Sequence, residues 1–90
     1  MTNGYHWEFN SSAYKQFKKL DRTVQLRLVK WLNDHIQGFD NPRAWGKELQ
    51  GNLSPFWRYR VGSYRIIADI QDEKFTVLVV KTAKRGEVYR

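Results

Sequence analysis

Residues 56–70, FWRYRVGSYRIIADI, have the pattern of a β-hairpin. Large apolar and polar residues alternate before Gly62-Ser63, and a second β-rich run follows this pair. Glycine at the first position of a two-residue turn favours type II′ and fixes the register of the two strands. The predicted opposite pairs are Val61 with Tyr64, Arg60 with Arg65, Tyr59 with Ile66 and Arg58 with Ile67.

This register separates the hairpin side chains onto two faces, because opposed residues of neighbouring strands share a face. The predicted core face consists of Trp57, Tyr59, Val61, Tyr64, Ile66 and Ala68. Arg58, Arg60 and Arg65 share the other face. Arg60 opposite Arg65 is unfavourable unless an anion or an acidic side chain lies between them. The cationic face is therefore either a solvated outer surface of the sheet or a site for an anion.

Two helices are predicted before the hairpin. Residues 5–9 alternate as a short strand, and Asn10-Ser11-Ser12 supplies helix N-cap residues after it. Apolar residues then recur at helical spacing in two segments, the second of which begins after Asp21 and ends at Gly38. We expect these amphipathic helices to cover the apolar face of the hairpin.

Further elements are predicted on both sides of the hairpin. Asn41-Pro42 breaks the chain, and residues 43–50 can form a short turn of helix. Residues 75–80 are nearly all apolar, as expected for a central strand covered on both faces, and residues 87–89 can form a last short strand. The expected fold is α+β, with two N-terminal helices packed on a small antiparallel sheet of about four to five strands in one domain, residues 1–90.

The composition is that of a small protein without cross-links. Its 90 residues include 4 Trp, 5 Tyr, 5 Phe and no Cys, which excludes disulfides, thiolate zinc sites and cysteine nucleophiles. No apolar run approaches the roughly 18 residues that a membrane span needs, and no targeting segment is apparent. We therefore expect a cytoplasmic protein.

The charge is strongly basic and unevenly distributed. The formal net charge is +7, and residues 43–90 hold ten basic and five acidic residues. Such an excess in a small domain indicates a polyanionic or acidic partner, either a nucleic acid or an acidic protein.

Basic residues outside the hairpin are candidates for contacts with RNA. Lys15, Lys18, Lys19 and Arg22 recur at spacings that predict a stripe on the first helix, opposite Tyr14 and Phe17. Such a stripe is either solvated or in contact with RNA phosphates. Lys81 and Lys84, at the end of the apolar strand, are further candidates, and Trp45 can either stack on a base or cover the core.

Three segments, taken in order, resemble the RelE/ParE toxin superfamily and in particular its RelE-type members. They are Lys47-Glu48-Leu49-Gln50-Gly51, residues 57–65, and the last segment with Lys84-Arg85 and Glu87-Val88-Tyr89. The resemblance extends over essentially the whole chain, including the two helices. It implies a toxin of a type II toxin-antitoxin system, with two helices packed on a small antiparallel sheet.

The resemblance also implies an activity and partners. RelE-type members are ribosome-dependent endoribonucleases that cut messenger RNA in the A site and inhibit translation. A ribose 2′-hydroxyl attacks its own 3′ phosphate, without a metal, so no cofactor is expected. The expected partners are the ribosome, messenger RNA and an acidic RelB-like antitoxin that covers the basic site.

Five residues match functional positions of the family. Arg65 matches the arginine that grips the scissile phosphate, Arg85 the one that protonates or neutralises the leaving oxygen, and Tyr89 the tyrosine that orients the nucleotide. Arg58 and Arg60 stand where the founding pattern has lysines. Because arginine stays protonated, we interpret them as electrostatic clamps, and the general base remains open.

Two other functions remain compatible with the sequence. ParE-type toxins of the same fold inhibit DNA gyrase as protein-binding modules and need no catalytic residues. A basic RNA-binding module without catalysis would keep the arginine face and would not depend on Tyr89. The presence of Arg85 together with Tyr89 favours the nuclease.

His6 and His35 are the remaining groups suited to proton transfer near neutral pH. Their positions, in the first predicted strand and near the end of the second predicted helix, separate them from the arginines. We therefore expect structural or surface roles for both. No cluster of His, Asp and Glu has the spacing of a metal site, so none is expected.

Overall fold

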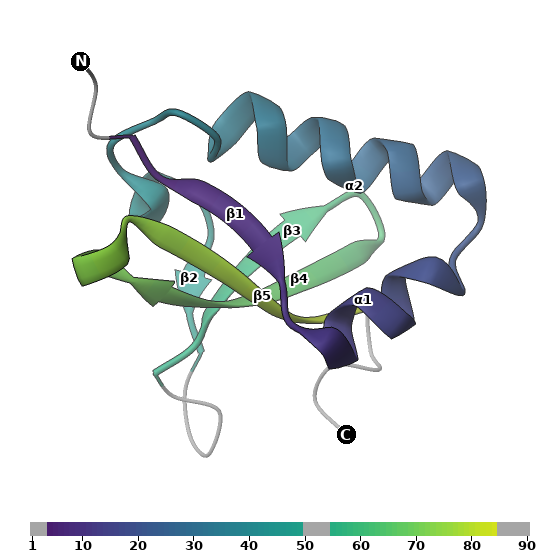
Figure 1. Cartoon of the computed structure of the whole chain (residues 1–90). Helices are drawn as coiled ribbons and strands as arrows, with labels where there is room; N and C mark the ends of the chain where they lie inside the picture. Colours follow the sequence, from purple (N-terminus) through teal and green to yellow (C-terminus); the bar gives the residue numbers. More distant parts are fainter. Residues whose placement is uncertain (1–3, 50–54, 85–90) are drawn as a thin grey trace.

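The computed structural model describes residues 4–49 and 55–84, in which two helices pack on a five-stranded sheet (Figure 1). The strand order is β1-β5-β4-β3-β2. The elements in chain order are β1 (His6–Phe9), α1 (Ser11–Lys18), α2 (Arg22–His35), the 3₁₀ turn η1 (Pro42–Ala44), β2 (Lys47–Glu48), β3 (Trp57–Val61), β4 (Tyr64–Gln71), the 3₁₀ turn η3 (Asp72–Lys74) and β5 (Thr76–Lys84). The predicted α+β class is confirmed. Neither of the described α-helices is long and apolar enough to cross a membrane.

The sheet is mixed, whereas the sequence predicted an antiparallel one. β1 runs parallel to β5, with Trp7 opposite Val77 and Phe9 opposite Val79, and the other neighbouring strands are antiparallel. A parallel pair needs a long crossover connection. Here both helices and three strands separate β1 from β5 along the chain. β5 consequently has strands on both sides, as expected for the apolar segment.

The β3–β4 hairpin has the predicted register. All four predicted pairs are present, and Trp57 also lies opposite Ala68. Gly62 has a φ of 62°, and Ser63 does not share this positive φ, which is the combination that a type II′ turn requires. The apolar and the cationic side chains of the hairpin are thereby fixed on opposite faces of the sheet.

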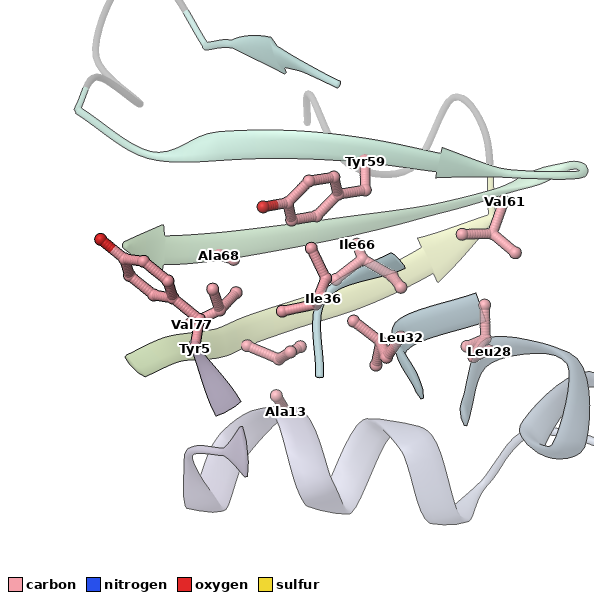
Figure 2. Packing of buried hydrophobic residues seen from close by; sticks show 11 residues of the cluster. Tyr5, Ala13, Leu28, Leu32, Ile36, Tyr59, Val61, Ile66, Ala68 and Val77 are labelled. Atoms are coloured by element: carbon pink, nitrogen blue, oxygen red, sulfur yellow. The ribbon is translucent and has the colours of Figure 1, made fainter. Parts of the chain in front are cut away.

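The main core lies between the helices and the apolar face of the sheet (Figure 2). Its buried members are Tyr5, Ala13, Leu28, Leu32, Ile36, Tyr59, Val61, Ile66, Ala68, Val77 and Val79. Tyr59 is fully buried, and its hydroxyl donates a hydrogen bond of 2.6 Å to the carbonyl oxygen of Pro42. This bond ties the connector after α2 to the centre of the core.

The predicted basic stripe does not lie on one helix. α1 ends at Lys18, Lys19 is its C-cap, and Arg22 is the first residue of α2. Gln25 fixes the reversal between the helices, since its side-chain amide donates hydrogen bonds of 3.0–3.3 Å to three carbonyls at the end of α1 and in the turn. Only Lys15 and Lys18 of the stripe therefore belong to α1.

The connector contains a strand that the sequence did not predict. The helical turn extends only over Pro42–Ala44. Lys47–Glu48 does not continue the helix expected over 43–50 but forms the strand β2, which pairs with β3. Gly46, with a φ of 78°, turns the chain toward β3, where Trp57 Nε1 donates to the carbonyl oxygen of Trp45 at 2.6 Å. A two-residue strand has no alternation to detect. The strand predicted at residues 87–89 lies outside the described residues.

A polar network at the surface joins the connector to the end of the sheet. The carboxylate of Asp72 accepts hydrogen bonds from the Tyr5 hydroxyl at 2.6 Å and from two guanidinium nitrogens of Arg43 at 3.0 and 3.1 Å. These bonds, that of Arg43 foremost, hold the pKa of Asp72 below its usual value. The network links η1 and η3 to the residue that precedes β1.

Candidate functional site

The cationic face lies on the side of β3 and β4 opposite the core that the helices cover. Arg58 and Arg60 flank the buried Tyr59 along β3, and Arg65 is the direct partner of Arg60 on β4. The structure therefore brings the three predicted arginines together on one face. They differ in environment, because Arg60 is exposed, Arg58 is half-buried and Arg65 is buried.

Arg65 is the most unusual member of this face. Its exposed fraction is 3%, and its Nε and Nη1 atoms are buried without a hydrogen-bond partner among the residues that the structure describes. Buried polar groups are normally paired, and an unpaired buried charge is costly. The planar guanidinium is suited to an oxyanion, which it can bind through two parallel hydrogen bonds.

A second, small apolar cluster explains the burial of Arg65. It contains the buried residues Leu49, Ile67 and Ala83, with Phe56 and Val80 packed against them. Ala83 lies opposite Arg65 in the β4–β5 ladder, so it shares the face of the arginine. The cationic face is consequently solvated only in part, because this cluster covers Arg65 whereas Arg60 is exposed.

Lys47 adds a fourth cation that the sequence did not assign to the site. It lies opposite Arg58 in the β2–β3 ladder and is exposed. Together with Gly46 and Arg60, these two residues line a hollow of about 210 Å³. The residue was missed because its place depends on β2, which only tertiary pairing reveals.

Three of the candidate lysines gather around a different hollow. It has a volume of about 470 Å³ and lies between the end of α1, the start of β4 and the end of β5. The residues around it are Gln16, Lys19, Leu20, Tyr64, Lys81, Thr82, Ala83 and Lys84. The side-chain oxygen of Gln16 accepts a hydrogen bond of 3.0 Å from the Thr82 amide and so fixes α1 against β5. Lys19, Lys81 and Lys84 form a basic rim there.

The other RNA-binding candidates do not join the arginines. Lys15 is exposed on α1, and Lys18 places its Nζ atom 5.4 Å from the centre of the Tyr14 ring, so Tyr14 does not lie opposite the stripe. Arg22 belongs to α2. Trp45 is 47% exposed and contacts His35 edge to face, with 4.7 Å between ring centres, so it does not cover the core.

The histidines lie apart from the cationic face. His6 is on β1, at the opposite edge of the sheet from β2, and its Nε2 atom is 3.3 Å from a carboxylate oxygen of Glu8. His35 ends α2, stacks on Trp31 with 4.4 Å between ring centres, and places Nδ1 2.9 Å from the carbonyl oxygen of Trp31. These contacts indicate structural roles.

Arg85 and Tyr89 lie outside the described residues. The described chain ends at Lys84, one residue after the partner of Arg65 on β5. The described part of the site therefore has the chemistry to bind an anion, because it contains one buried guanidinium and three further cations.

The sequence matches one known family over most of its length. Residues 7–89 match the family described as the ParE toxin of type II toxin-antitoxin system, parDE. The chain is 32% identical over 88 residues to the mRNA interferase toxin RelE of Escherichia coli K12, a match that covers 94% of this chain and 90% of that protein. It is 27% identical over 86 residues to Toxin RelG of Mycobacterium tuberculosis, covering 96% and 97% of the two chains.

Solved structures of similar proteins share the fold. The toxin of the toxin-antitoxin complex RelBE2 from Mycobacterium tuberculosis superposes with a TM-score of 0.81 at 26% identity, over 97% of each chain. The isolated Escherichia coli RelE toxin superposes with a TM-score of 0.72 at 30% identity, over 96% of this chain and 92% of that one.

Proposed function

The chain belongs to the RelE/ParE toxin superfamily of type II toxin-antitoxin systems, and from this premise we propose that it is a ribosome-dependent endoribonuclease that cleaves messenger RNA in the A site. The observation that supports this most is the buried guanidinium of Arg65, which has two unpartnered nitrogens among the described residues. A phosphate oxygen is an acceptor that would satisfy them.

The proposed reaction transfers the phosphoryl group from one oxygen of the RNA to another. The 2′-hydroxyl oxygen attacks the adjacent phosphorus, the bond to the 5′-oxygen of the next nucleotide breaks, and a 2′,3′-cyclic phosphate and a 5′-hydroxyl result. The 2′-hydroxyl loses one proton and the leaving oxygen gains one, so no other reactant is consumed, and the reaction is proposed to proceed without a metal. The site has to hold the reacting atoms in line and to stabilise charge on the phosphate.

Each arginine of the site has a proposed role. Arg65 binds oxygens of the scissile phosphate, and Arg58 and Arg60 stabilise the negative charge that develops there. Neither can act as a general base, because a guanidinium does not lose its proton in proteins. By resemblance, Arg85 neutralises or protonates the leaving oxygen, and Tyr89 orients the nucleotide.

The lysines around the larger hollow are proposed to position the RNA. Lys19, Lys81 and Lys84 lie on its rim, close to the β4 residue that precedes Arg65. Contacts of this kind neutralise backbone phosphates without reading sequence. Lys15, Lys18, Arg22 and Trp45 are proposed as weaker contacts with the ribosome.

An acidic antitoxin is the proposed partner of the silent toxin. The similar chains of known structure include toxins from RelBE complexes of Mycobacterium tuberculosis and Escherichia coli. The net charge of +7 and the cationic face give this chain the complementary surface. The carboxylates of a RelB-like antitoxin would cover the arginines and exclude RNA.

Gyrase inhibition is the second candidate function, because the matching family carries the ParE name. A purified translation system with mapping of message ends separates the two. The nuclease predicts cuts in the A-site codon that weaken in Arg85→Ala and Tyr89→Phe. Intact message, together with growth arrest and gyrase-linked DNA breaks, would refute it. Equal cleavage of naked RNA would refute the ribosome dependence.

A further inference from the structure

We propose that a hollow at the end of α2 binds an arginine or lysine side chain of a ribosomal protein. The hollow has a volume of about 230 Å³, and the residues around it are Asp34, His35, Phe39, Asp40, Asn41, Ala44 and Trp45. This inference rests on the proposed ribosome-dependent function. It specifies the chemistry of the ribosome contact proposed above for Trp45.

Two large aromatic side chains are exposed at this hollow. Phe39 is 50% exposed and Trp45 is 47% exposed. Apolar side chains that gather on a surface mark interaction sites, and tryptophan is a frequent anchor of protein interfaces. The volume is smaller than the roughly 300–1,000 Å³ of small-molecule sites, so the hollow suits a single side chain better than a cofactor.

Hydrogen bonds and ring contacts hold the walls of the hollow in place. The carbonyl oxygen of Phe39 accepts a hydrogen bond of 2.8 Å from the amide of Tyr5. The carbonyl oxygen of Trp45 accepts the bond of 2.6 Å from the Trp57 indole, and the Trp45 ring contacts that of His35 edge to face. A side chain that binds here therefore meets walls that are already ordered, which reduces the entropic cost of binding.

The hollow is acidic, although the protein as a whole is basic. Lysine or arginine lines both hollows described above, whereas Asp34 and Asp40 are the only charged residues of the described chain that line this one, apart from His35. Asp34 has an exposed ion pair of 2.8 Å with Lys30, a type of pair that contributes little. The described residues provide no ion pair or hydrogen bond for the Asp40 carboxylate. The last turn of α2 contains no lysine or arginine to offset the negative end of the helix dipole, so the hollow favours a cation.

The exposed indole of Trp45 is suited to the same ligand. The face of an indole ring attracts cations, and arginine more often than lysine takes this place in proteins. Trp57 already has such a partner, because the guanidinium carbon of Arg43 lies 6.0 Å from the centre of its ring. Among the described residues, no cation has this relation to Trp45. A long basic side chain can also bury its methylene groups against Phe39 while its charge stays near Asp40.

The ribosome is the proposed partner that offers such side chains. Carboxylates of an acidic antitoxin and phosphates of RNA would both be repelled by Asp34 and Asp40. Proteins that bind ribosomal RNA are rich in arginine and lysine. In Figure 1 the end of α2 and the chain after it lie on the left, away from α1 and the end of β5. The hollow can therefore contact a ribosomal protein while the lysines at the end of β5 contact RNA.

The affinity for purified ribosomes tests the site with two variants that each remove one negative charge. The ribosomes carry a message with 2′-deoxy sugars in the A-site codon, which lacks the attacking hydroxyl and stays intact. Asp40→Asn should bind about two- to five-fold more weakly than the wild type, because the cation loses its counter-charge. Asp21→Asn changes the exposed N-cap of α2, about 20 Å from the last residue of this helix, and should bind at least as tightly as the wild type. Equal or tighter binding of Asp40→Asn, as general attraction to RNA would produce, would overturn the proposal.

Trp45→Leu separates the contact with a cation from a merely apolar contact. The variant keeps an apolar side chain and loses the indole face, so its affinity for the same ribosomes should fall about three- to ten-fold. Adding Asp40→Asn to it should cost less than Asp40→Asn does alone, because both side chains contact the same cation. Wild-type affinity of Trp45→Leu, with an unchanged thermal unfolding midpoint, would contradict the site.

Photo-crosslinking on these ribosomes identifies the partner. The photoreactive p-benzoylphenylalanine takes the place of Phe39, and mass spectrometry identifies the molecules joined to it. The expected product contains a peptide of a ribosomal protein with an arginine or lysine. Crosslinks to ribosomal RNA alone, to a second copy of this chain, or to no molecule would overturn the proposal. If the wild type still cleaves messages in the A site, only the docking site is refuted, whereas a wild type that neither binds nor cleaves refutes the proposed function itself.

Discussion

Arg60 and Arg65 are direct partners in the β3–β4 ladder, yet Arg60 is exposed and only 3% of Arg65 is exposed. The two arginines therefore lie at the border between solvent and the small apolar cluster around Ile67. A buried cation beside a like charge lowers the stability of the free protein. An anion bound between the two side chains would relieve both effects.

Arg65→Met is expected to stabilise the free protein by about 1–3 kcal/mol, because a linear apolar side chain replaces a buried guanidinium whose Nε and Nη1 atoms have no hydrogen-bond partner among the described residues. Urea unfolding of the two proteins at neutral pH measures the difference. Arg60→Met, at the exposed partner, serves as the control and should change the free energy of unfolding by less than about 0.5 kcal/mol. A clear loss of stability in Arg65→Met would show that the guanidinium is satisfied in the free protein.

Gly46→Ala is expected to destabilise the protein more than Gly38→Ala does. Both glycines have positive φ values, of 78° and 83°, so both variants have an unfavourable backbone conformation. An added Cβ at Gly38 meets no atom within 4 Å, whereas at Gly46 it would overlap with the Arg58 carbonyl and lie 2.9 Å from Trp57 Nε1. Gly38→Ala should cost about 1 kcal/mol, and Gly46→Ala at least about 1 kcal/mol more. Equal losses in thermal unfolding would refute the close contact of β2 with β3.

Tyr59→Phe is expected to lower the free energy of unfolding by about 1–2 kcal/mol, because the carbonyl oxygen of Pro42 loses its donor in the core. Burial also raises the pKa of the Tyr59 phenol. A raised folded pKa gives stability that is complete below the unfolded pKa of about 10 and is lost as pH rises above it. Tyr59→Phe should therefore lack part of the alkaline loss seen in the wild type. Tyr14→Phe, at an exposed phenol, should keep it.

Asp72→Asn is expected to reduce stability at neutral pH by no more than about 1 kcal/mol, since the network of Asp72 with Arg43 and Tyr5 lies at the surface. The pKa of Asp72 is lowered in the folded protein, by Arg43 foremost. Its contribution is therefore present above the unfolded pKa of about 4 and is lost as pH falls through the folded pKa. The two proteins should differ at pH 7 and converge in acid. A constant difference across this range would show that the carboxylate charge does not matter.

The sequence predicted the hairpin well because its register depends on local chemistry. Gly62 favours a type II′ turn, and this turn type fixes which residues of β3 and β4 lie opposite each other. This register places the three arginines on one face. The start of α1 was also set locally, by its N-cap Asn10, whose side chain accepts from the Ala13 amide at 2.7 Å.

Features that depend on distant parts of the chain were not predicted. The parallel pairing of β1 follows from where the helices return the chain, and a two-residue strand such as β2 has no pattern of its own. The burial of Arg65 results from residues on neighbouring strands, such as Leu49 and Ala83. No property of the arginine or of its immediate neighbours indicates that burial.

The most direct test of the account is the rate at which Arg65→Met cleaves messenger RNA in the ribosomal A site, measured in single turnover with mapping of the new 5′ ends. The account predicts a folded variant whose cleavage is slower than that of the wild type by about a hundred-fold or more, as expected when a group that stabilises transition-state charge is removed. Cleavage by Arg65→Met at the wild-type rate and position would contradict the assignment of Arg65 to the scissile phosphate.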